Sequence, residues 1–233
     1  MHRTNRINRR RLHAILPILY IPVMTIFLAF SVVEAQKNNR EAAQRAFDRG
    51  YQYQTGKGIR KDLGRALEAY REAFTKDKSY ADAYYNFALI AFYEFQRYDL
   101  AELGFKNYLQ FHPNDAKTVH DLGVAYHKQG KFEEAIRQYR RALELKPDMA
   151  QAHYNLGNIY YHLKRPEMAL QEWDKAIQLD PENETYINRR KRIKEIKRQK
   201  ESVLSPDNVW WIMYGLAGVF VAYCIFYMFR KRR

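Results

Sequence analysis

The chain has 233 residues, a net charge of +14 and a single cysteine, Cys224. One cysteine excludes an intrachain disulfide and any metal or redox site built from paired cysteines. The charge is unevenly spread, because segments 1–11, 188–201 and 230–233 carry +5, +6 and +4, whereas residues 34–187 carry no net charge. Basic clusters beside apolar segments are typical of membrane boundaries, so this distribution does not favour a nucleic-acid-binding protein.

Residues 12–33 form the first predicted element, directly after the basic tail 1–11. They are uncharged and almost wholly apolar over 22 residues, which is enough for a helix to span about 30 Å of hydrocarbon. Two interpretations stay open: an uncleaved transmembrane anchor, or a signal peptide that is cleaved after Ala35. A signal-peptide core usually has about 7–15 apolar residues, so the length of this run favours the anchor.

Residues 37–78 are predicted to form a helical hairpin. Gly56 and Gly58 interrupt the helical period between its two helices. Asp62 is a predicted N-cap for the second helix, because short polar side chains accept hydrogen bonds from the free N–H groups of a first turn. The glycine pair lacks the spacing of a phosphate-binding loop, so we expect it only to turn the chain.

A sequence period of 34 residues follows. Pro113, Pro147 and Pro181 stand 34 residues apart, and small and aromatic residues recur at fixed distances before each proline. Such a period indicates a repeated helical hairpin: small residues let two helices approach closely, aromatic rings fill the space between neighbours, and proline ends the second helix. The positions that this pattern predicts to be buried are Ala101, Phe105, Tyr108, Ala135, Tyr139, Ala142, Ala169, Trp173 and Ala176.

This pattern resembles the tetratricopeptide repeat (TPR) family. Segments 116–149 and 150–182 carry its Leu-Gly-x-x-Tyr, alanine, aromatic and proline marks at nearly every position, whereas segment 79–115 is looser. The hairpin 37–78, with its longer glycine-containing turn, resembles the SEL-like variant of the repeat. The resemblance implies an all-α solenoid whose hairpins bury their apolar faces only against one another. We expect membrane-spanning helices to flank it at the C-terminus and at the N-terminus.

Residues 183–203 are predicted to form a basic helix that caps the repeat array, because a terminal repeat needs a polar outer face. The same helix offers cations to an anionic lipid or polymer. The candidate residues for that contact are Arg189, Arg190, Lys191, Arg192, Lys194, Lys197 and Arg198.

Residues 209–229 are predicted to form a transmembrane helix. Trp210 and Trp211 stand at one end of this uncharged segment and the basic tail 230–233 at the other, as expected at the two membrane interfaces. The two basic tails place both chain ends in the cytoplasm, so we expect the repeats to be extracytoplasmic, and periplasmic in a bacterium. The alternative is a tail-anchored protein with cytosolic repeats.

The sequence contains no catalytic motif, so it predicts neither an enzyme nor a cofactor, and lone histidines predict no metal site. In the TPR family the first helices of the hairpins line a concave groove that binds peptides. The resemblance implies that the groove residues of this chain are Asn86, Tyr93, Lys117, His120, His127, Lys128, Gln151, Tyr154, Asn158, Tyr161 and His162.

The predicted function is a membrane-anchored scaffold that binds a protein or peptide partner in this groove, in the assembly of a membrane or envelope complex. The alternative is a module that binds anionic lipid or another anionic surface through the basic segment 188–201. A homo-oligomer has no support in the sequence.

Overall fold

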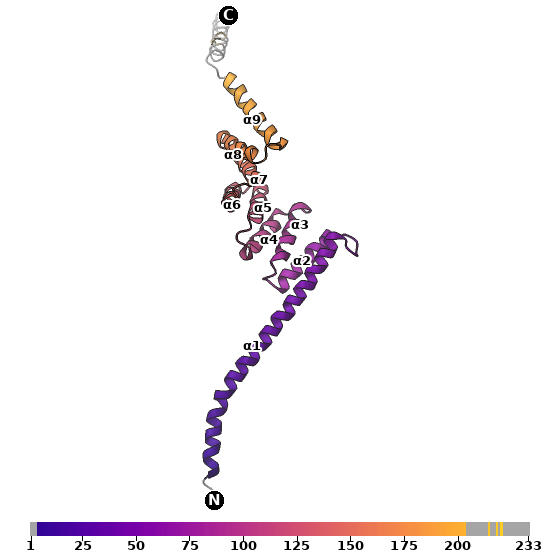
Figure 1. Ribbon diagram of the computed structural model, residues 1–233, viewed down its shortest axis with the longest axis vertical. Coiled ribbons are helices and arrows are strands. Elements are labelled where there is room, and N and C mark those ends of the chain that lie inside the picture. The colour runs from indigo at the N-terminus through magenta and orange to yellow at the C-terminus, as the bar shows by residue number, and fades with distance from the viewer. Residues whose placement is uncertain (1–3, 204–213, 215–217, 219, 221–233) are drawn as a thin grey trace, which may run out of the picture. The chain divides into compact units, whose positions relative to one another are not determined.

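The computed structural model describes residues 4–203, 214, 218 and 220, with side chains from residue 24 onward except those of 200 and 203. This described part contains nine α-helices and no strand. The chain divides into two compact units, Met1–Gln138 and Tyr139–Arg233, with the division inside α6. The helices in chain order (Figure 1) are α1 (Thr4–Thr55), α2 (Leu63–Lys76), α3 (Ala81–Tyr93), α4 (Tyr98–Phe111), α5 (Ala116–Lys128), α6 (Phe132–Leu145), α7 (Ala150–His162), α8 (Pro166–Leu179) and α9 (Glu184–Val203).

In the first unit each helix packs against its neighbour in the chain from α1 to α5. A core of Ala66, Tyr70, Phe87 and Ile90 joins α2 to α3. Tyr70 has no exposed surface, and its hydroxyl donates a hydrogen bond of 2.6 Å to the side chain of Gln54 on α1. The buried ring therefore has a partner for its one polar atom, as burial of a tyrosine requires.

In the second unit α7 packs against α8 and α8 against α9. Trp173 on α8 has no exposed surface, and its indole Nε1 donates to the backbone oxygen of Tyr154 on α7 at 3.2 Å. This approach depends on Gly157, because a Cβ at that position would lie 2.4 Å from Trp173 Nε1. The Leu-Gly pair of the repeat thus has a packing role: its glycine admits the aromatic ring of the second helix.

Eight of the nine positions that the 34-residue period predicts to be buried are buried, and Tyr108, where the other two hairpins have alanine, is half-buried. The exposed fractions are 0–1% for Ala101, Phe105, Ala135, Tyr139, Ala142, Ala169, Trp173 and Ala176. This confirms the predicted packing pattern of the hairpins.

The turns inside the three later hairpins share one backbone conformation. Gln96, Gly130 and Lys164, which stand 34 residues apart, have φ values of 52°, 75° and 62°. Only one of the three is glycine, the residue that adopts this left-handed conformation at no steric cost. Pro166, two residues after Lys164, is the first residue of α8, a position that suits proline because its missing N–H would have no partner there.

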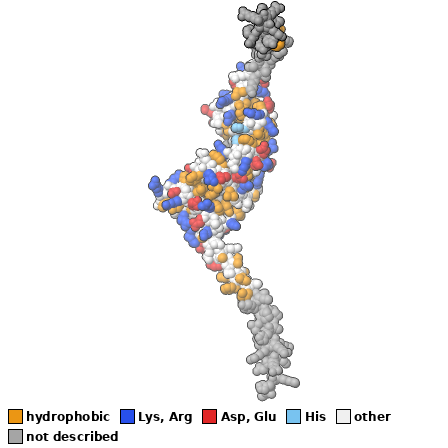
Figure 2. Space-filling view, turned by 180° about the vertical axis from the view of Figure 1, so that it is seen from behind, with side chains coloured by type: hydrophobic (Ala, Val, Ile, Leu, Met, Phe, Trp, Pro, Cys, Tyr) orange, Lys and Arg blue, Asp and Glu red, His pale blue; other side chains and the backbone are white. Residues whose placement is uncertain are grey.

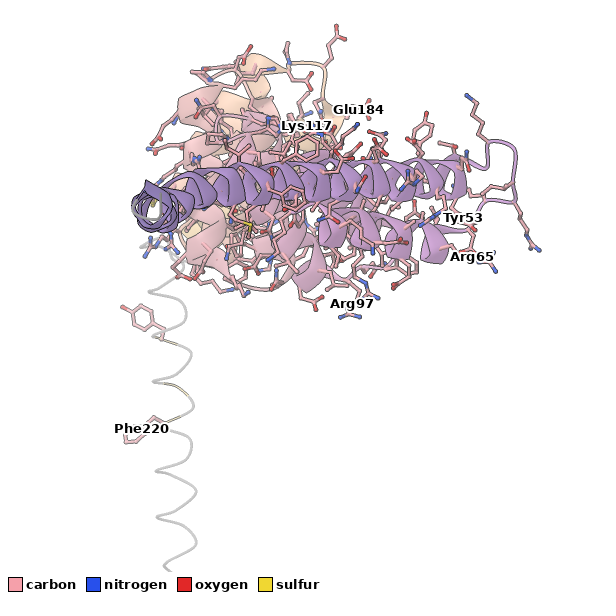
Figure 3. All side chains as sticks on the ribbon, turned by 90° about the horizontal axis from the view of Figure 1, so that it is seen from below. Tyr53, Arg65, Arg97, Lys117, Glu184 and Phe220 are labelled. Atoms are coloured by element: carbon pink, nitrogen blue, oxygen red, sulfur yellow. The ribbon has the colours of Figure 1, made fainter. Side chains whose placement is uncertain are left out.

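The turn between α1 and α2 is longer. Gly56 and Gly58 have positive φ values, 73° and 77°, which confirms that they turn the chain. The Asp62 carboxylate accepts a hydrogen bond of 2.9 Å from the backbone N–H of Arg65, which confirms Asp62 as an N-cap. The Arg65 guanidinium lies 5.7 Å from the ring centroid of Tyr53, so a cation–π contact joins α2 to the end of α1 (Figure 3).

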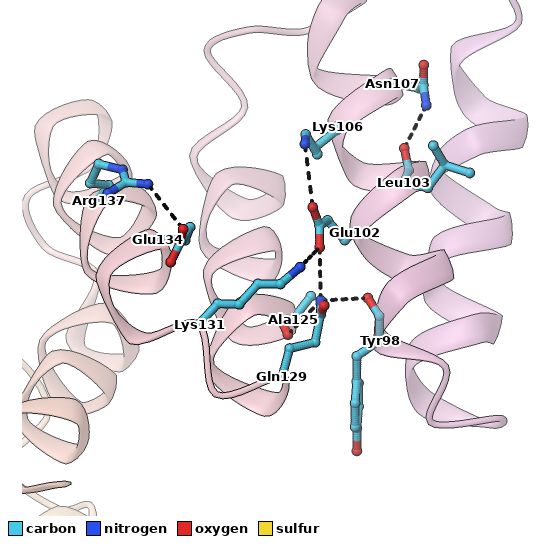
Figure 4. A network of polar contacts seen from close by, with 10 residues as sticks. All are labelled: Tyr98, Glu102, Leu103, Lys106, Asn107, Ala125, Gln129, Lys131, Glu134 and Arg137. Carbon is cyan, nitrogen blue, oxygen red and sulfur yellow. Dashed lines mark hydrogen bonds and ion pairs between the residues drawn. The ribbon is translucent and has the colours of Figure 1, made fainter.

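A polar network joins α4 to the turn between α5 and α6 (Figure 4). The carboxylate of Glu102 accepts hydrogen bonds from Lys131 at 2.8 Å, Gln129 at 3.1 Å and Lys106 at 3.4 Å. The side-chain amide of Gln129 also donates to the backbone oxygen of Tyr98 at 3.1 Å. Burial acts to raise the pKa of Glu102, but the hydrogen bonds from Lys131 and Gln129 outweigh it and hold the pKa below its usual range.

Helix α1 runs without a break from Thr4 to Thr55, so the apolar run 12–33 and the first helix of hairpin 37–78 are one helix. The sequence analysis treats them as two elements. They are continuous because the polar residues between them include neither glycine nor proline, the residues that most strongly interrupt a helix.

In the part of the chain that the structure describes, no helix is both long and apolar enough to cross a membrane. The predicted span 209–229 and the tail 230–233 lie outside the described residues, apart from residues 214, 218 and 220, and so do the side chains of residues 12–23. The described end of the apolar run exposes large side chains to solvent, for example Ile26, Phe27 and Phe30 at 67–69% (Figure 2).

Candidate functional site

The α3–α5 surface, which we define by Tyr85, Tyr93, Lys117, His120 and Asp121, groups polar and aromatic side chains of two predicted groove helices of the first unit. The ammonium of Lys117 donates a hydrogen bond of 2.7 Å to the hydroxyl of Tyr85. His120 Nδ1 lies 3.1 Å from a carboxylate oxygen of Asp121. The surface therefore presents an ammonium, a largely buried carboxylate and two phenols from two successive repeats, whereas His120 is buried with 8% of its surface exposed.

The backbone of both helices fixes the Lys117–Tyr85 pair. Asp115 is the N-cap of α5, and its carboxylate accepts hydrogen bonds from the N–H of Lys117 at 3.1 Å and the hydroxyl of Thr118 at 2.7 Å. The ring of Tyr85 packs against Tyr108 of α4 with centroids 5.0 Å apart. Lys117 therefore leaves the first turn of α5 beside a ring that α4 already holds in place.

Tyr93 and Lys117 are electrostatically coupled. The hydrogen bond to Tyr85 raises the pKa of Lys117, and the charge of Asp121 adds to that effect. Partial desolvation raises the pKa of Tyr93, Asp121 raises it further and Lys117 acts to lower it. Both groups are therefore protonated at neutral pH, so Lys117 is a cation and Tyr93 is a neutral phenol. Tyr93 is 66% exposed.

The other predicted groove residues of this unit lie apart from the α3–α5 surface. The side chain of Asn86 acts to lower the pKa of Tyr70 on α2, so it lies on the side of α3 that faces α2. His127 packs its ring against Phe132 with centroids 5.8 Å apart, and Lys128 is exposed at the end of α5. Of the six residues predicted here, Tyr93, Lys117 and His120 therefore belong to the site.

Sequence reasoning missed Tyr85 and Asp121. Tyr85 occupies the aromatic position that the repeat pattern assigns to packing, and its ring does pack, while its hydroxyl reaches Lys117. Asp121 follows Lys117 by four residues on α5 and so shares its helix face. Two spacings in the sequence point to these residues. Asp121 is four residues after Lys117, and Tyr85 is eight residues before Tyr93.

In the second unit, α9 covers part of the predicted groove. The ring of Tyr154 packs against Tyr186 of α9 with centroids 4.6 Å apart. Tyr161 stays 37% exposed, and Gln151 and His162 are exposed. The side-chain oxygen of Asn158 is buried and accepts no hydrogen bond from the residues that the structure describes.

Helix α9 presents fewer available cations than its sequence predicts. Arg190 forms an ion pair with Asp174 of α8, and Lys197 forms one of 3.3 Å with Glu167 at the start of α8. These pairs fasten the helix to α8, beside the buried side chains of Tyr186 and Ile193. The exposed cations of the predicted anionic-surface group are Lys191, Arg192, Lys194 and Arg198, with Arg189 half-buried.

Comparisons with known protein families identify repeats in part of the chain. Residues 123–164 match a family model described as TPR repeat, and residues 150–183 match one described as tetratricopeptide repeat. These matches confirm that this part of the chain carries tetratricopeptide repeats. No match to a curated protein was found.

Several solved structures share the fold. A structure of MamA is 21% identical with a TM-score of 0.54, over 67% of this chain and 86% of that chain. YrrB, described as a TPR protein with an unusual peptide-binding site, is 22% identical with a TM-score of 0.59, over 70% and 87%. PilF of Pseudomonas aeruginosa is 21% identical with a TM-score of 0.54, over 70% and 72%. The chain is therefore similar to all-helical TPR solenoids.

Proposed function

We propose that the chain is a membrane-anchored, non-enzymatic scaffold that binds an extended segment of a partner protein on the α3–α5 surface. The observation that carries this proposal is the exposed Tyr93 ring on the same surface as the hydrogen-bonded Lys117–Tyr85 pair, close enough for Lys117 to act on its pKa. A fold shared with a TPR protein that is described as having a peptide-binding site supports the same class of ligand.

The chemistry of the α3–α5 surface suits a peptide backbone. A lysine ammonium has three donors, and Tyr85 accepts one of them, so the others can reach carbonyl oxygens of an extended segment. Asp121 offers carboxylate oxygens to backbone N–H groups of the same segment. The Tyr93 ring adds apolar contact area at a small loss of conformational entropy, since a tyrosine side chain has few rotatable bonds.

Selection of peptides tests this proposal. A phage-displayed library of random peptides is selected on the full chain in detergent, and the selected peptides are then measured on variants. We expect the double variant Tyr93→Ala/Lys117→Met to weaken binding by about tenfold or more, as truncation of central aromatic and cationic contacts does. The matched control Tyr51→Ala/Lys57→Met changes the same residue types on α1 and its loop. Equal binding by both variants and the unaltered chain would remove the α3–α5 surface from consideration.

We also propose that residues 12–33 and 209–229 are membrane spans and that the repeats are extracytoplasmic. The length and lack of charge of both segments, and the exposed apolar side chains at the described end of the first, support the spans. The basic tails support the orientation. Hairpin 37–78 is, in this proposal, a SEL-like repeat, which its longer glycine-containing turn supports.

Protease protection tests the orientation. A tag in the repeats of the full chain should be digested when protease is added to cells whose cytoplasmic membrane is intact, after the outer membrane has been opened in a bacterium that has one. Digestion only after the cytoplasmic face is opened would support the tail-anchored alternative and a search for cytosolic partners. N-terminal sequencing of the mature protein separates the two interpretations of residues 12–33, because a chain that starts at Gln36 has lost a signal peptide.

A further inference from the structure

An open pocket of about 670 Å³ lies between α1 and the loop that joins α2 to α3. Val33, Lys37 and Arg40 of α1 line one side, since residues three, four and seven positions apart share a helix face. The last residue of α2, Lys76, and the loop residues Asp77 and Lys78 line the other side. This pocket lies away from the α3–α5 surface and takes no part in the function proposed for that surface.

The pocket is strongly cationic. It contains four basic side chains, Lys37, Arg40, Lys76 and Lys78, against the single carboxylate of Asp77. That carboxylate already accepts hydrogen bonds from the N–H and the hydroxyl of Ser79, at 2.9 Å and 2.6 Å. None of the four cations forms an ion pair with a residue that the structure describes. The pocket therefore has an excess of positive charge that a bound anion would neutralise.

The walls of the pocket are held together before any ligand arrives. Tyr80, directly after the loop, donates its hydroxyl to the side-chain oxygen of Gln44 on α1 at 2.7 Å. Its ring packs against Phe47, also on α1, with centroids 5.2 Å apart. These contacts fix the loop to α1, so a ligand would lose little free energy in ordering the site.

The pocket begins where the exposed apolar part of α1 ends. Val33 is the last large apolar side chain of that run, at 61% exposed, and it lines the pocket. Lys37 and Arg40 are four and seven residues farther along the same helix, about 6 Å and 10 Å at a rise of about 1.5 Å per residue. The headgroup layer on each side of a bilayer core is about 5–8 Å thick. If α1 leaves the core at Val33, Lys37 lies within this layer and Arg40 lies just beyond it, where its long side chain can reach back to lipid phosphates.

We propose that this pocket binds the headgroup of an anionic phospholipid in the leaflet that faces the repeats. The inference rests on the proposed insertion of residues 12–33 into the bilayer. The phosphate and any further negative charge of the headgroup bind among Lys37, Arg40, Lys76 and Lys78, while the acyl chains lie along the apolar part of α1. Because α1 continues without a break into the first hairpin, the bound lipid would also hold that hairpin at a fixed distance from the membrane.

The test measures which lipids copurify with the full chain. The protein is incubated in mild detergent with an equimolar mixture of phosphatidylglycerol and phosphatidylcholine, purified again, and its bound lipids are quantified by mass spectrometry. We expect phosphatidylglycerol to be enriched at least about fivefold, the factor expected for one basic residue near an anionic surface. The variant Lys37→Gln/Arg40→Gln/Lys76→Gln/Lys78→Gln should bring the bound ratio back to that of the mixture. All four side chains are exposed, so the variant should keep the helical circular-dichroism spectrum of the unaltered chain.

A matched control removes four exposed cations from α9. The variant Lys191→Gln/Arg192→Gln/Lys194→Gln/Arg198→Gln should keep the enrichment. Loss of enrichment in the α9 variant, or its persistence in the pocket variant, overturns the proposal. Loss of enrichment on addition of inorganic phosphate at constant ionic strength would also overturn it, because the site would then take a free anion rather than a lipid.

The experiments distinguish failure of the membrane proposal from failure of the headgroup proposal. A mature chain that starts at Gln36, or a chain that carbonate extracts from membranes, would show that residues 12–33 do not anchor the protein and would overturn both proposals. A chain that resists carbonate and retains residues 12–33, yet shows no lipid preference, would overturn the headgroup site alone.

Discussion

The ammonium nitrogen of Lys117 lies 2.7 Å from the hydroxyl oxygen of Tyr85, so a hydrogen bond joins α5 of one repeat to α3 of the preceding one. This bond is the largest cause of the raised pKa of Lys117. It makes Lys117 a fixed cation on a surface that otherwise offers phenols and one carboxylate.

Replacement of Tyr85 by phenylalanine should lower the pKa of Lys117, because it removes the acceptor and leaves the packing ring in place. A lysine with a lower pKa has more free amine at a given pH, so Lys117 should react faster with acetic anhydride. Competitive labelling followed by mass spectrometry measures that rate. Lys131, whose pKa is raised by Glu102 rather than by Tyr85, is the internal control and should keep its rate. An unchanged rate at Lys117 would contradict the assigned role of the bond.

Gly157→Ala should destabilise the second unit. The added Cβ would lie 2.4 Å from Trp173 Nε1 and 2.6 Å from its Cδ1, so either the ring or α7 must move. Such overpacking costs about 1–3 kcal/mol of the free energy of unfolding. Thermal unfolding followed by circular dichroism measures it. Gly64→Ala is a suitable comparison, since a Cβ there would meet only a carboxylate oxygen of Asp62 at 3.4 Å, and we expect no loss of stability from it.

The repeat period accounts for much of the fold because it records which side chains are buried between hairpins. The burial of Phe105 and Trp173 follows from spacing alone, since each ring recurs at one place in a 34-residue unit. The continuity of α1 is harder to predict, because a change from apolar to polar composition resembles a boundary even where no residue interrupts the helix. The apolar run ends at residue 33, but the helix continues to Thr55.

The candidate site was only partly predictable for a related reason. A repeat pattern assigns one role to each position, whereas Tyr85 has two, a packed ring and a hydroxyl that binds Lys117. Tyr154 shows the opposite case: its position predicts a groove residue, but Tyr186 of the non-repeat helix α9 packs against its ring. Contacts made by a segment outside the repeat leave no trace in the repeat period.

Lys164→Gly should stabilise the protein. Lys164 has a φ of 62°, a left-handed conformation that costs a residue with a Cβ about 1–2 kcal/mol, partly offset by the larger entropy that glycine loses on folding. We expect a net gain of about 0.5–1 kcal/mol in the free energy of unfolding. Gly130, at the same place in the preceding hairpin with a φ of 75°, is the reciprocal test: Gly130→Ala should lower stability by a similar amount. A loss of stability in Lys164→Gly would show that the lysine side chain makes contacts that outweigh the strain of its backbone.

Glu102→Gln should lower stability in a way that depends on pH. The pKa of Glu102 is held below its usual range by hydrogen bonds from Lys131 and Gln129, against the opposing effect of burial. A carboxyl whose pKa is lower in the folded chain stabilises the fold fully above its unfolded pKa of about 4.3, and this contribution disappears as the pH falls through the folded pKa. At neutral pH we expect a loss of about 1–2 kcal/mol, less than for a fully buried charged hydrogen bond, because solvent screens part of the interaction.

The stability difference between Glu102→Gln and the unaltered chain should therefore shrink below about pH 4. Urea unfolding of the full chain in detergent at neutral and acidic pH measures the difference directly. The control is Glu134→Gln, which removes an exposed carboxylate 3.6 Å from Arg137 and should cost less than about 1 kcal/mol at any pH, as exposed ion pairs do. A constant difference across the pH range would mean that Glu102 stabilises the turn between α5 and α6 by packing and not by charge. A stability difference that appears only at neutral pH would show that the ionised carboxylate of Glu102 stabilises the network in Figure 4.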